Sequence, residues 1–234
     1  LADGTRIRGD RFLLCAGGHA RRLPIPGAEL AMTHSDVWTL RARPRSVVIV
    51  GAAATGCQLA SIFNDLGTKV TLLEAAEHIL PGEDGAVSDA VLRGFVADGI
   101  EVVTQVRVEA IERVDGVLEA RWTSADGVRA ARAEAVLMAV GWIGNADELR
   151  LSCAGVETAH GYVVVNERLQ TSAPHIFAAG DLTGQMMLVQ SASREAHTAV
   201  DNAVLGLQRS GRHSVVPHGG FTDPEYGSVG LTEA

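Results

Sequence analysis

The residues from Ser46 to Glu74 combine a turn of small residues with a later carboxylate, an arrangement that could hold a dinucleotide. In the run GAAATG, Gly51 and Gly56 occupy the first and third fixed positions of a GxGxxG turn. Gly51 can adopt the backbone angles of a tight turn, and Gly56 has no side chain to keep a helix off the sheet. Glu74 follows roughly 20 residues later, where an acid receives the hydroxyls of an adenosine ribose. The spacing predicts a dinucleotide site.

A strand, a helix and a second strand must position these residues. The apolar run from Val47 to Val50, with Ser46 before it, is typical of a parallel strand buried on both faces. A helix is expected from Cys57 to Leu66 with Gly67 at its C-cap, and Val70 to Leu73 return as the second strand. The expected inner face of the helix consists of Leu59, Ile62, Phe63 and Leu66.

The second fixed position of the turn is Ala53 instead of glycine. Backbone amides must approach a pyrophosphate closely there, and a methyl group is a modest intrusion. The alternative is an ordinary βαβ unit whose small residues only let helix and strand pack. With strand, helix and acid all in place, the dinucleotide interpretation is preferred. The residues expected to contact the cofactor are Gly51, Ala52, Ala53, Ala54, Thr55, Gly56, Cys57, Gln58 and Glu74.

The composition limits the classes of function. The 234 residues are 47% hydrophobic and 21% charged, with a formal net charge of −8, values typical of a globular α/β protein. The arginines are scattered or paired, so nucleic acid is not an expected partner. No apolar run approaches the ~20 residues that cross a bilayer, so no membrane partner is expected either. The chain is expected to be cytoplasmic.

Cysteines and histidines indicate no second chemistry. Cys15, Cys57 and Cys153 form no CxxC or CxxxxC pair, so no redox dithiol and no catalytic residue is assigned. Cys57 opens the helix after the turn, a position that can lower a thiol pKa, but a small buried side chain is the preferred interpretation. The eight histidines have no metal-ligand spacing, so no metal site is predicted.

Further elements flank the unit. LADGTRIRGD is typical of the end of a β-hairpin, and a buried strand is expected from Arg11 to Cys15. A helix is expected from Ala86 to Asp98 and a strand from Ile100 to Val103. A β-meander is expected over Val106 to Arg113, Val117 to Thr123 and Val128 to Arg132, followed by a closing strand from Ala135 to Val140.

Seven segments along the chain occur in the order of one known family. They read RFLLCAGG, PIPG, VVIVGAAATG, VTLLE, LMAVGWIGN, TSAPHIFAAGD and FTDPEYGSVGLTEA. The chain thus resembles the pyridine nucleotide-disulfide oxidoreductases, flavoenzymes that include dihydrolipoamide dehydrogenase, glutathione reductase and mercuric reductase. Members have a flavin domain interrupted by an NAD(P)H domain and followed by a dimerisation domain.

The resemblance implies an α/β, Rossmann-like FAD/NAD(P)-binding fold, with a parallel sheet and a β-meander, in which an NAD domain is inserted in a partial FAD domain. Residues 1–40 would end the first FAD segment, 41–142 form the NAD(H)-binding domain, 143–212 the second FAD segment, and 213–234 the start of a truncated dimerisation domain. The chain would be the middle of a homodimeric parent. The first FAD fingerprint and CxxxxC disulfide would lie upstream, and the His-Glu acid/base pair downstream.

The resemblance also assigns residues to FAD. Asp181 ends a buried strand, where ligands bind in open α/β sheets, and it matches the aspartate that binds the ribityl chain. An aspartate that only caps the next turn is the alternative. A helix is expected from about Val189 to Leu205, with its amino end near the flavin N1 and O2 region. The other expected contacts are Ala16, Gly17, Gly18, Met187, Leu188, Val189 and Gln190.

NAD is expected in preference to NADP. Glu74 would repel a 2′-phosphate, and the two alanines after it supply no arginine to neutralise one. Val106 matches the family residue that lines the adenine pocket, and Gly141 matches the glycine of the GRxPN motif, here GWIGN. Gln58 replaces an acid that is common in the family.

The predicted function is that of a fragment of a flavin-dependent NAD(P)H oxidoreductase that moves electrons between NADH, FAD and a disulfide or related acceptor. This fragment would supply the NAD site and part of the FAD site, and alone it is expected to be inactive and to retain little FAD. Its expected partners are NAD(H), FAD and the missing segments of the parent. Two alternatives stay open: a non-catalytic nucleotide-binding module, suggested by Ala53 and Gln58, and a disulfide-independent transhydrogenase or flavin reductase.

Overall fold

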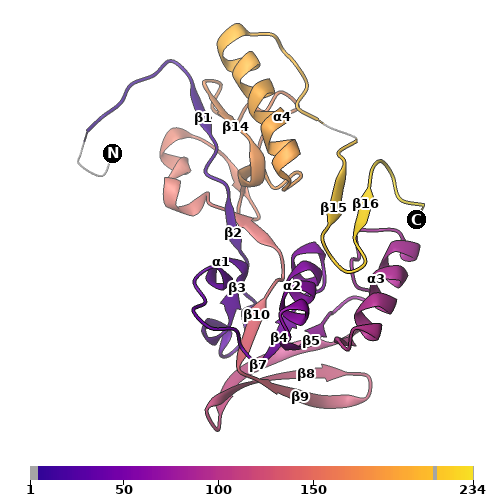
Figure 1. The fold of residues 1–234 in the computed structure, drawn as a ribbon. Helices are drawn as coiled ribbons and strands as arrows, with labels where there is room; N and C mark the ends of the chain where they lie inside the picture. Colours follow the sequence, from indigo (N-terminus) through magenta and orange to yellow (C-terminus); the bar gives the residue numbers. More distant parts are fainter. Residues whose placement is uncertain (1–4, 213–214, 234) are drawn as a thin grey trace. The chain divides into compact units, whose positions relative to one another are not determined.

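The structure, a computed structural model, describes residues 5–212 and 215–233 and divides the chain into two compact units (Figure 1). One unit comprises Leu1–His19 and Trp142–Val216, and the other comprises Ala20–Gly141 and Pro217–Ala234. Residues 1–4, which begin the expected hairpin end, residues 213–214 and residue 234 lie outside the described part. The division into four domains stays a prediction.

A five-stranded parallel sheet forms the centre of the unit that contains residues 20–141. Its strands are, in spatial order, β3 (Met32–Thr33), β10 (Ala135–Met138), β4 (Ser46–Val50), β5 (Lys69–Leu73) and β6 (Glu101–Val103). Val47 to Val50 are all buried because both faces of the sheet are covered, as the unbroken apolar run predicts.

Two helices, α2 (Ala54–Asp65) and α3 (Gly85–Ala97), cover one face of this sheet (Figure 1). Helix α2 starts three residues earlier than expected, because Ala53 has extended backbone angles and the residues after it are already helical. Gly67, at φ 80°, follows the helix, and its N–H donates to the Asn64 carbonyl, so the expected C-cap is confirmed. Leu66 was wrongly placed on the inner face, since α2 ends before it and leaves it 59% exposed.

The expected β-meander covers the other face. Strands β7 (Arg107–Val114), β8 (Val117–Ser124) and β9 (Gly127–Ala133) pair antiparallel. Their inward side chains, among them Ile111, Leu118 and Trp122, pack on the sheet in a second apolar cluster. Asp115 and Gly116 both have positive φ, as a two-residue hairpin turn requires.

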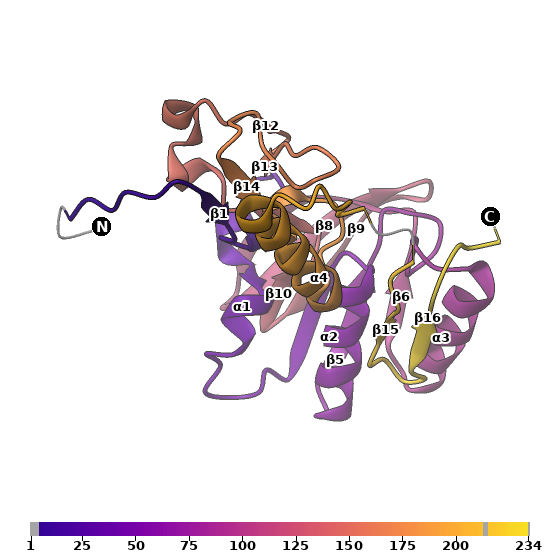
Figure 2. The same cartoon turned by 90° about the horizontal axis from the view of Figure 1, so that it is seen from above.

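A C-terminal hairpin joins this unit. Strands β15 (His218–Gly220) and β16 (Tyr226–Ser228) lie beside α3 in both views (Figures 1 and 2). Tyr226 packs against the helix-side core, and a Cβ added to Gly94 of α3 would lie 2.5 Å from the Pro224 ring. The hairpin therefore fits into a gap in α3 that only glycine leaves open. The short helices η1 (Ala28–Leu30) and α1 (His34–Val37) complete the unit.

The other unit is built on the parallel pair β1 (Phe12–Leu14) and β14 (Ile176–Ala178). Helix α4 (Val189–Val200) continues into the π-helical turn η5 (Asp201–Leu205). Together they span the helix expected from about Val189 to Leu205. The remaining elements are β2 (Gly18–Ala20), β11 (Trp142–Gly144), β12 (Thr158–Ala159), β13 (Tyr162–Val163), η2 (Asp147–Leu149), η3 (Leu151–Ala154) and η4 (Gly180–Thr183). In the described residues, no helix has the length and apolar character to cross a membrane.

Candidate functional site

The turn between β4 and α2 depends on two glycines. Gly51 has φ 97°, and a Cβ on it would lie 2.6 Å from the Ala139 carbonyl oxygen. A Cβ on Gly56 would lie 1.8 Å from the Gly51 carbonyl oxygen. Both positions therefore require glycine, the first for its backbone angles and the second for the contact of helix and strand.

Three backbone amides at the start of α2 precede the first α-helical hydrogen bond. The Cys57 N–H donates to the Ala53 carbonyl at 3.0 Å, which makes it the first amide bonded in the helical pattern. The N–H groups of residues 54–56 precede it and have no helical acceptor, and Ala53 supplies no side-chain cap. Ala53 and Ala54 are exposed. The positive end of the helix dipole is thus open to an anion.

The Glu74 carboxylate is fixed at the end of β5 by two backbone amides. One oxygen accepts the Ala52 N–H at 2.5 Å and the other accepts the Ala76 N–H at 2.8 Å. A carboxylate can accept about four hydrogen bonds, so each oxygen keeps room for a further donor. Ala52, expected to contact a cofactor, is fully buried and its amide is occupied by Glu74.

A cavity of about 520 Å³ opens beside this turn, entirely within the same unit. Five of the expected contact residues line it, namely Gly51, Ala53, Glu74, Val106 and Gly141, and Ala54, Thr55, Gly56 and Gln58 do not. The apolar lining also includes Leu23, Ile25, Val108 and Val140, which the sequence analysis missed. The signal was present for Val108, because Val106 and Val108 are alternate buried residues around the start of β7.

Cys57 lies beneath the turn and away from the cavity. Its side chain is fully buried, and the thiol donates to the Ala52 carbonyl oxygen at 3.1 Å. Burial raises the pKa of the Cys57 thiol to about 12. The thiol is therefore neutral and unreactive at ordinary pH, which supports a small buried side chain over a reactive one.

Arg107 also lines the cavity and was missed. The side chain is exposed, and within the described residues no ion pair of Arg107 is found. The sequence places it one residue after Val106, on a strand whose alternate residues face solvent. A guanidinium at this rim is the one group lining the cavity that could favour a 2′-phosphate.

Four of the eight residues expected to contact FAD line a second cavity, of about 430 Å³, in the other unit. Gly17, Asp181, Met187 and Val189 line it, whereas Ala16, Gly18, Leu188 and Gln190 do not. Ala16 and Gly18 have structural contacts instead. The Ala16 carbonyl accepts the Asn145 side-chain amide at 2.8 Å, and a Cβ on Gly18 would lie 2.8 Å from the Ile143 carbonyl oxygen.

Glu195, which the sequence analysis missed, holds the backbone of Gly180 in the wall of the second cavity. Its side chain is 1% exposed, and it accepts the Gly180 N–H at 2.7 Å and the Ser191 hydroxyl at 3.2 Å. Gly180, with φ 74°, immediately precedes Asp181. The buried carboxylate therefore fixes the backbone that carries Asp181. The i, i+4 spacing of Ser191 and Glu195 on a helix was the available signal.

Cys15 contributes an exposed thiol to this cavity. Partial burial raises its thiol pKa above the usual value. The structure therefore gives no reason to assign Cys15 a redox role.

Comparisons with known proteins identify the family of the chain. The family model described as pyridine nucleotide-disulphide oxidoreductase matches residues 1–196. Mercuric reductase from Lysinibacillus sphaericus is 32% identical over 235 residues, which cover 99% of this chain and 43% of that protein. Dihydrolipoyl dehydrogenase from Chlamydia pneumoniae is 32% identical over 232 residues, which cover 98% of this chain and 49% of that protein. The chain therefore spans about half the length of these relatives.

Solved structures give the same result. The HOCl-induced flavoprotein disulfide reductase RclA from Escherichia coli matches 97% of this chain and 52% of its own, with 27% identity and a TM-score of 0.89. LpdA from Mycobacterium tuberculosis matches 94% of this chain and 48% of its own, with 29% identity and a TM-score of 0.83. The family resemblance is confirmed: this chain belongs to the pyridine nucleotide-disulphide oxidoreductase family.

Proposed function

We propose that the unit containing residues 20–141 binds the adenosine and pyrophosphate portion of NAD(H). The observation that carries the proposal is the Glu74 carboxylate, fixed by two amides at the rim of an apolar cavity and beside the open start of α2. The carboxylate suits the ribose hydroxyls, the apolar cavity suits adenine, and the helix start suits the pyrophosphate.

The residues present fit such a cofactor. Ile25, Val106 and Val108 supply an apolar wall for adenine, and the Glu74 oxygens have room to accept the ribose hydroxyls. The amides of residues 54–56 would donate to the pyrophosphate. The glycine at position 56 keeps α2 close enough to β4 for those amides to be presented at the turn.

The second cavity would hold part of FAD. Asp181, fixed through Gly180 and Glu195, would accept hydrogen bonds from the ribityl hydroxyls. When bound, flavin and nicotinamide supply hydride and electron transfer, and the chain supplies binding and orientation. We infer that the parent protein is a flavin-dependent NAD(P)H oxidoreductase acting on a disulfide or related acceptor, and that this chain contributes both nucleotide sites in whole or part.

Titration of the chain with NADH and with NADPH tests the nicotinamide site. NADH is expected to bind more tightly, because Glu74 repels a 2′-phosphate. The Glu74→Gln variant removes the charge and keeps an acceptor oxygen for only one of the two backbone amides, so NADH affinity should fall about tenfold while discrimination against NADPH is lost. Glu77→Gln, an exposed neighbour in the same loop, is the matched control and should leave both affinities unchanged.

The Arg107→Gln variant distinguishes NAD from NADP as the cofactor. If NAD is the ligand, this variant should leave the preference for NADH in place. Tighter binding of NADPH to the natural chain, with selective loss of NADPH affinity in Arg107→Gln, would show that Arg107 outweighs Glu74 and that NADP is the cofactor. Absence of binding for both nucleotides would contradict the proposed function altogether.

A further inference from the structure

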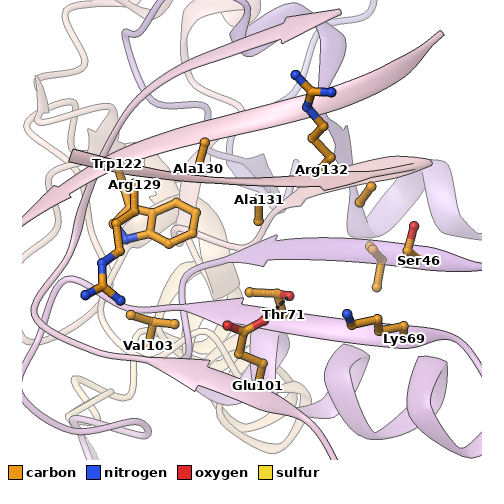
Figure 3. Close-up of a pocket in the computed structure, with 12 residues that line it drawn as sticks. Ser46, Lys69, Thr71, Glu101, Val103, Trp122, Arg129, Ala130, Ala131 and Arg132 are labelled. Carbon is orange, nitrogen blue, oxygen red and sulfur yellow. Dashed lines mark hydrogen bonds between the residues drawn. The ribbon is translucent and has the colours of Figure 1, made fainter. Parts of the chain in front are cut away.

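A third cavity, of about 400 Å³, lies between the parallel sheet and the β-meander of the unit containing residues 20–141 (Figure 3). Its floor is formed where the strands begin, since Ser46, Lys69 and Glu101 are the first residues of β4, β5 and β6. The NAD(H) site proposed above lies where β4 and β5 end. In a parallel sheet these are opposite edges, so the third cavity is separate from the proposed nucleotide site.

The indole N–H of Trp122 is a polar group without a partner in the wall of this cavity. Trp122 is 4% exposed, and its Nε1 atom has no hydrogen-bond acceptor among the residues that the structure describes. Arg129 is its direct cross-strand neighbour on β9, and Figure 3 shows the Arg129 side chain running alongside the indole ring. Buried N–H groups are nearly always bonded, so this one requires an acceptor that residues 5–212 and 215–233 do not supply.

Opposite charges line the cavity without pairing with each other. The Glu101 carboxylate accepts only the Thr71 hydroxyl, at 3.0 Å, among the interactions found in residues 5–212 and 215–233. Lys69 lies on the same floor beside Glu101 in Figure 3, and no ion pair joins the two side chains in the described residues. Arg132 is already paired with Glu119 at 2.7 Å, whereas the ion pair found for Arg129 in the described part of the chain is a long contact of 3.8 Å with Asp126.

We propose that this cavity binds a small zwitterion of the amino-acid class. The ligand carboxylate would accept the Trp122 N–H and pair with the Arg129 guanidinium, which is flexible enough to move off the indole. The ligand ammonium would pair with Glu101, which has acceptor capacity left beside Thr71. Lys69 and Arg129 would attract a phosphate dianion, but Glu101 would repel it, and the dianion has no cationic group to pair with Glu101.

The indole N–H itself gives the readout. In a ¹⁵N–¹H correlation spectrum the three tryptophans give separate indole signals, and the signal lost in Trp122→Phe identifies residue 122. L-serine is the probe, 3-hydroxypropionate is the same molecule without the ammonium group, and ethanolamine is the same molecule without the carboxylate. L-serine should move the Trp122 signal saturably, and each analogue should bind about tenfold more weakly or less. Inorganic phosphate should not move it.

Matched variants separate a built site from general surface effects. Arg129→Gln and Glu101→Gln should each weaken serine binding about tenfold. Arg113→Gln and Glu109→Gln, exposed on β7 and outside the cavity, should leave it unchanged. The remaining amide signals report whether each variant is folded. The proposal is overturned if serine leaves the Trp122 signal unmoved, if 3-hydroxypropionate or phosphate binds as well as serine, or if Glu101→Gln binds serine normally. NADH binding at the opposite edge is measured independently, so failure here would leave the nicotinamide proposal intact.

Discussion

At the scale of single residues, the βαβ turn requires two positions that have no Cβ atom. The contact between Gly56 and the Gly51 carbonyl, and the positive φ of Gly51, leave no space for a methyl group at either position. The two glycines in the sequence are therefore enough to predict the turn. The sequence could not predict that Glu74 would occupy the Ala52 amide, because that contact depends on how β5 is placed beside β4.

Replacing Gly56 with alanine should therefore destabilise the chain by about 3 kcal/mol, because a Cβ would overlap a backbone oxygen that belongs to the sheet. Urea unfolding followed by circular dichroism measures the change. Gly85→Ala is the control: it lies in the first turn of α3 with no neighbour within 4 Å, and it should be neutral or slightly stabilising. Equal midpoints for both variants would contradict the contact.

The thiols offer a second residue-scale prediction. Cys57 is fully buried with its pKa raised to about 12, whereas Cys15 and Cys153 are exposed. A thiol reagent that requires the thiolate should label the exposed pair in the native chain at pH 8 and reach Cys57 only after unfolding. Mass spectrometry of the labelled peptides decides the matter. Rapid native labelling of Cys57 would show that the turn opens readily.

At the scale of elements, the apolar pattern of a segment was sufficient to predict the regular strands. The parallel strands and the meander follow from continuous and alternating apolar patterns, and the structure confirms them. The wall at Leu23 and Ile25 has no such period. It is fixed from outside, because the Ile111 N–H donates to the Pro26 carbonyl and Gly27 packs against the Ile111 carbonyl. Contacts of this kind are set by the tertiary fold and leave no local signal in the sequence.

The tertiary contact between Glu195 of helix α4 and the Gly180 N–H leads to a prediction about stability. Replacing Glu195 with alanine should cost about 1–3 kcal/mol, since the Gly180 N–H would be left without its acceptor. Glu195→Gln keeps an acceptor oxygen and should recover most of the loss. Thermal unfolding of both variants checks this. A full loss in Glu195→Gln would instead show that the charge, and not the hydrogen bond, supports the Asp181 segment.

At the scale of the whole molecule, two buried acidic groups set the alkaline limit of stability. Burial raises the pKa of Cys57 and of Tyr226 to about 12 each, from ordinary values of 9.0 and 10.0. Because the folded chain holds these protons more tightly than the unfolded chain, their contribution is fully present below pH 9. It is lost as the pH rises toward 12.

The free energy of unfolding should therefore fall steadily between about pH 9 and pH 12, as measured by urea titrations at fixed ionic strength. Tyr226→Phe removes one of the two groups without removing a hydrogen bond of the described structure, because the Tyr226 hydroxyl has no partner within residues 5–212 and 215–233. Its decline should be shallower above pH 10. A curve identical to that of the natural chain would show that the tyrosine does not contribute.

The C-terminal hairpin also affects the order in which the chain can fold during synthesis. Residues 20–141 are made as one continuous stretch. Pro224, which lies against Gly94, and Tyr226, which packs on the helix-side core, are made only after the intervening residues 142–216. Until then α3 keeps an apolar surface exposed to water and to chaperones. Residues 217–228 thus complete a unit whose other residues are made before residues 142–216.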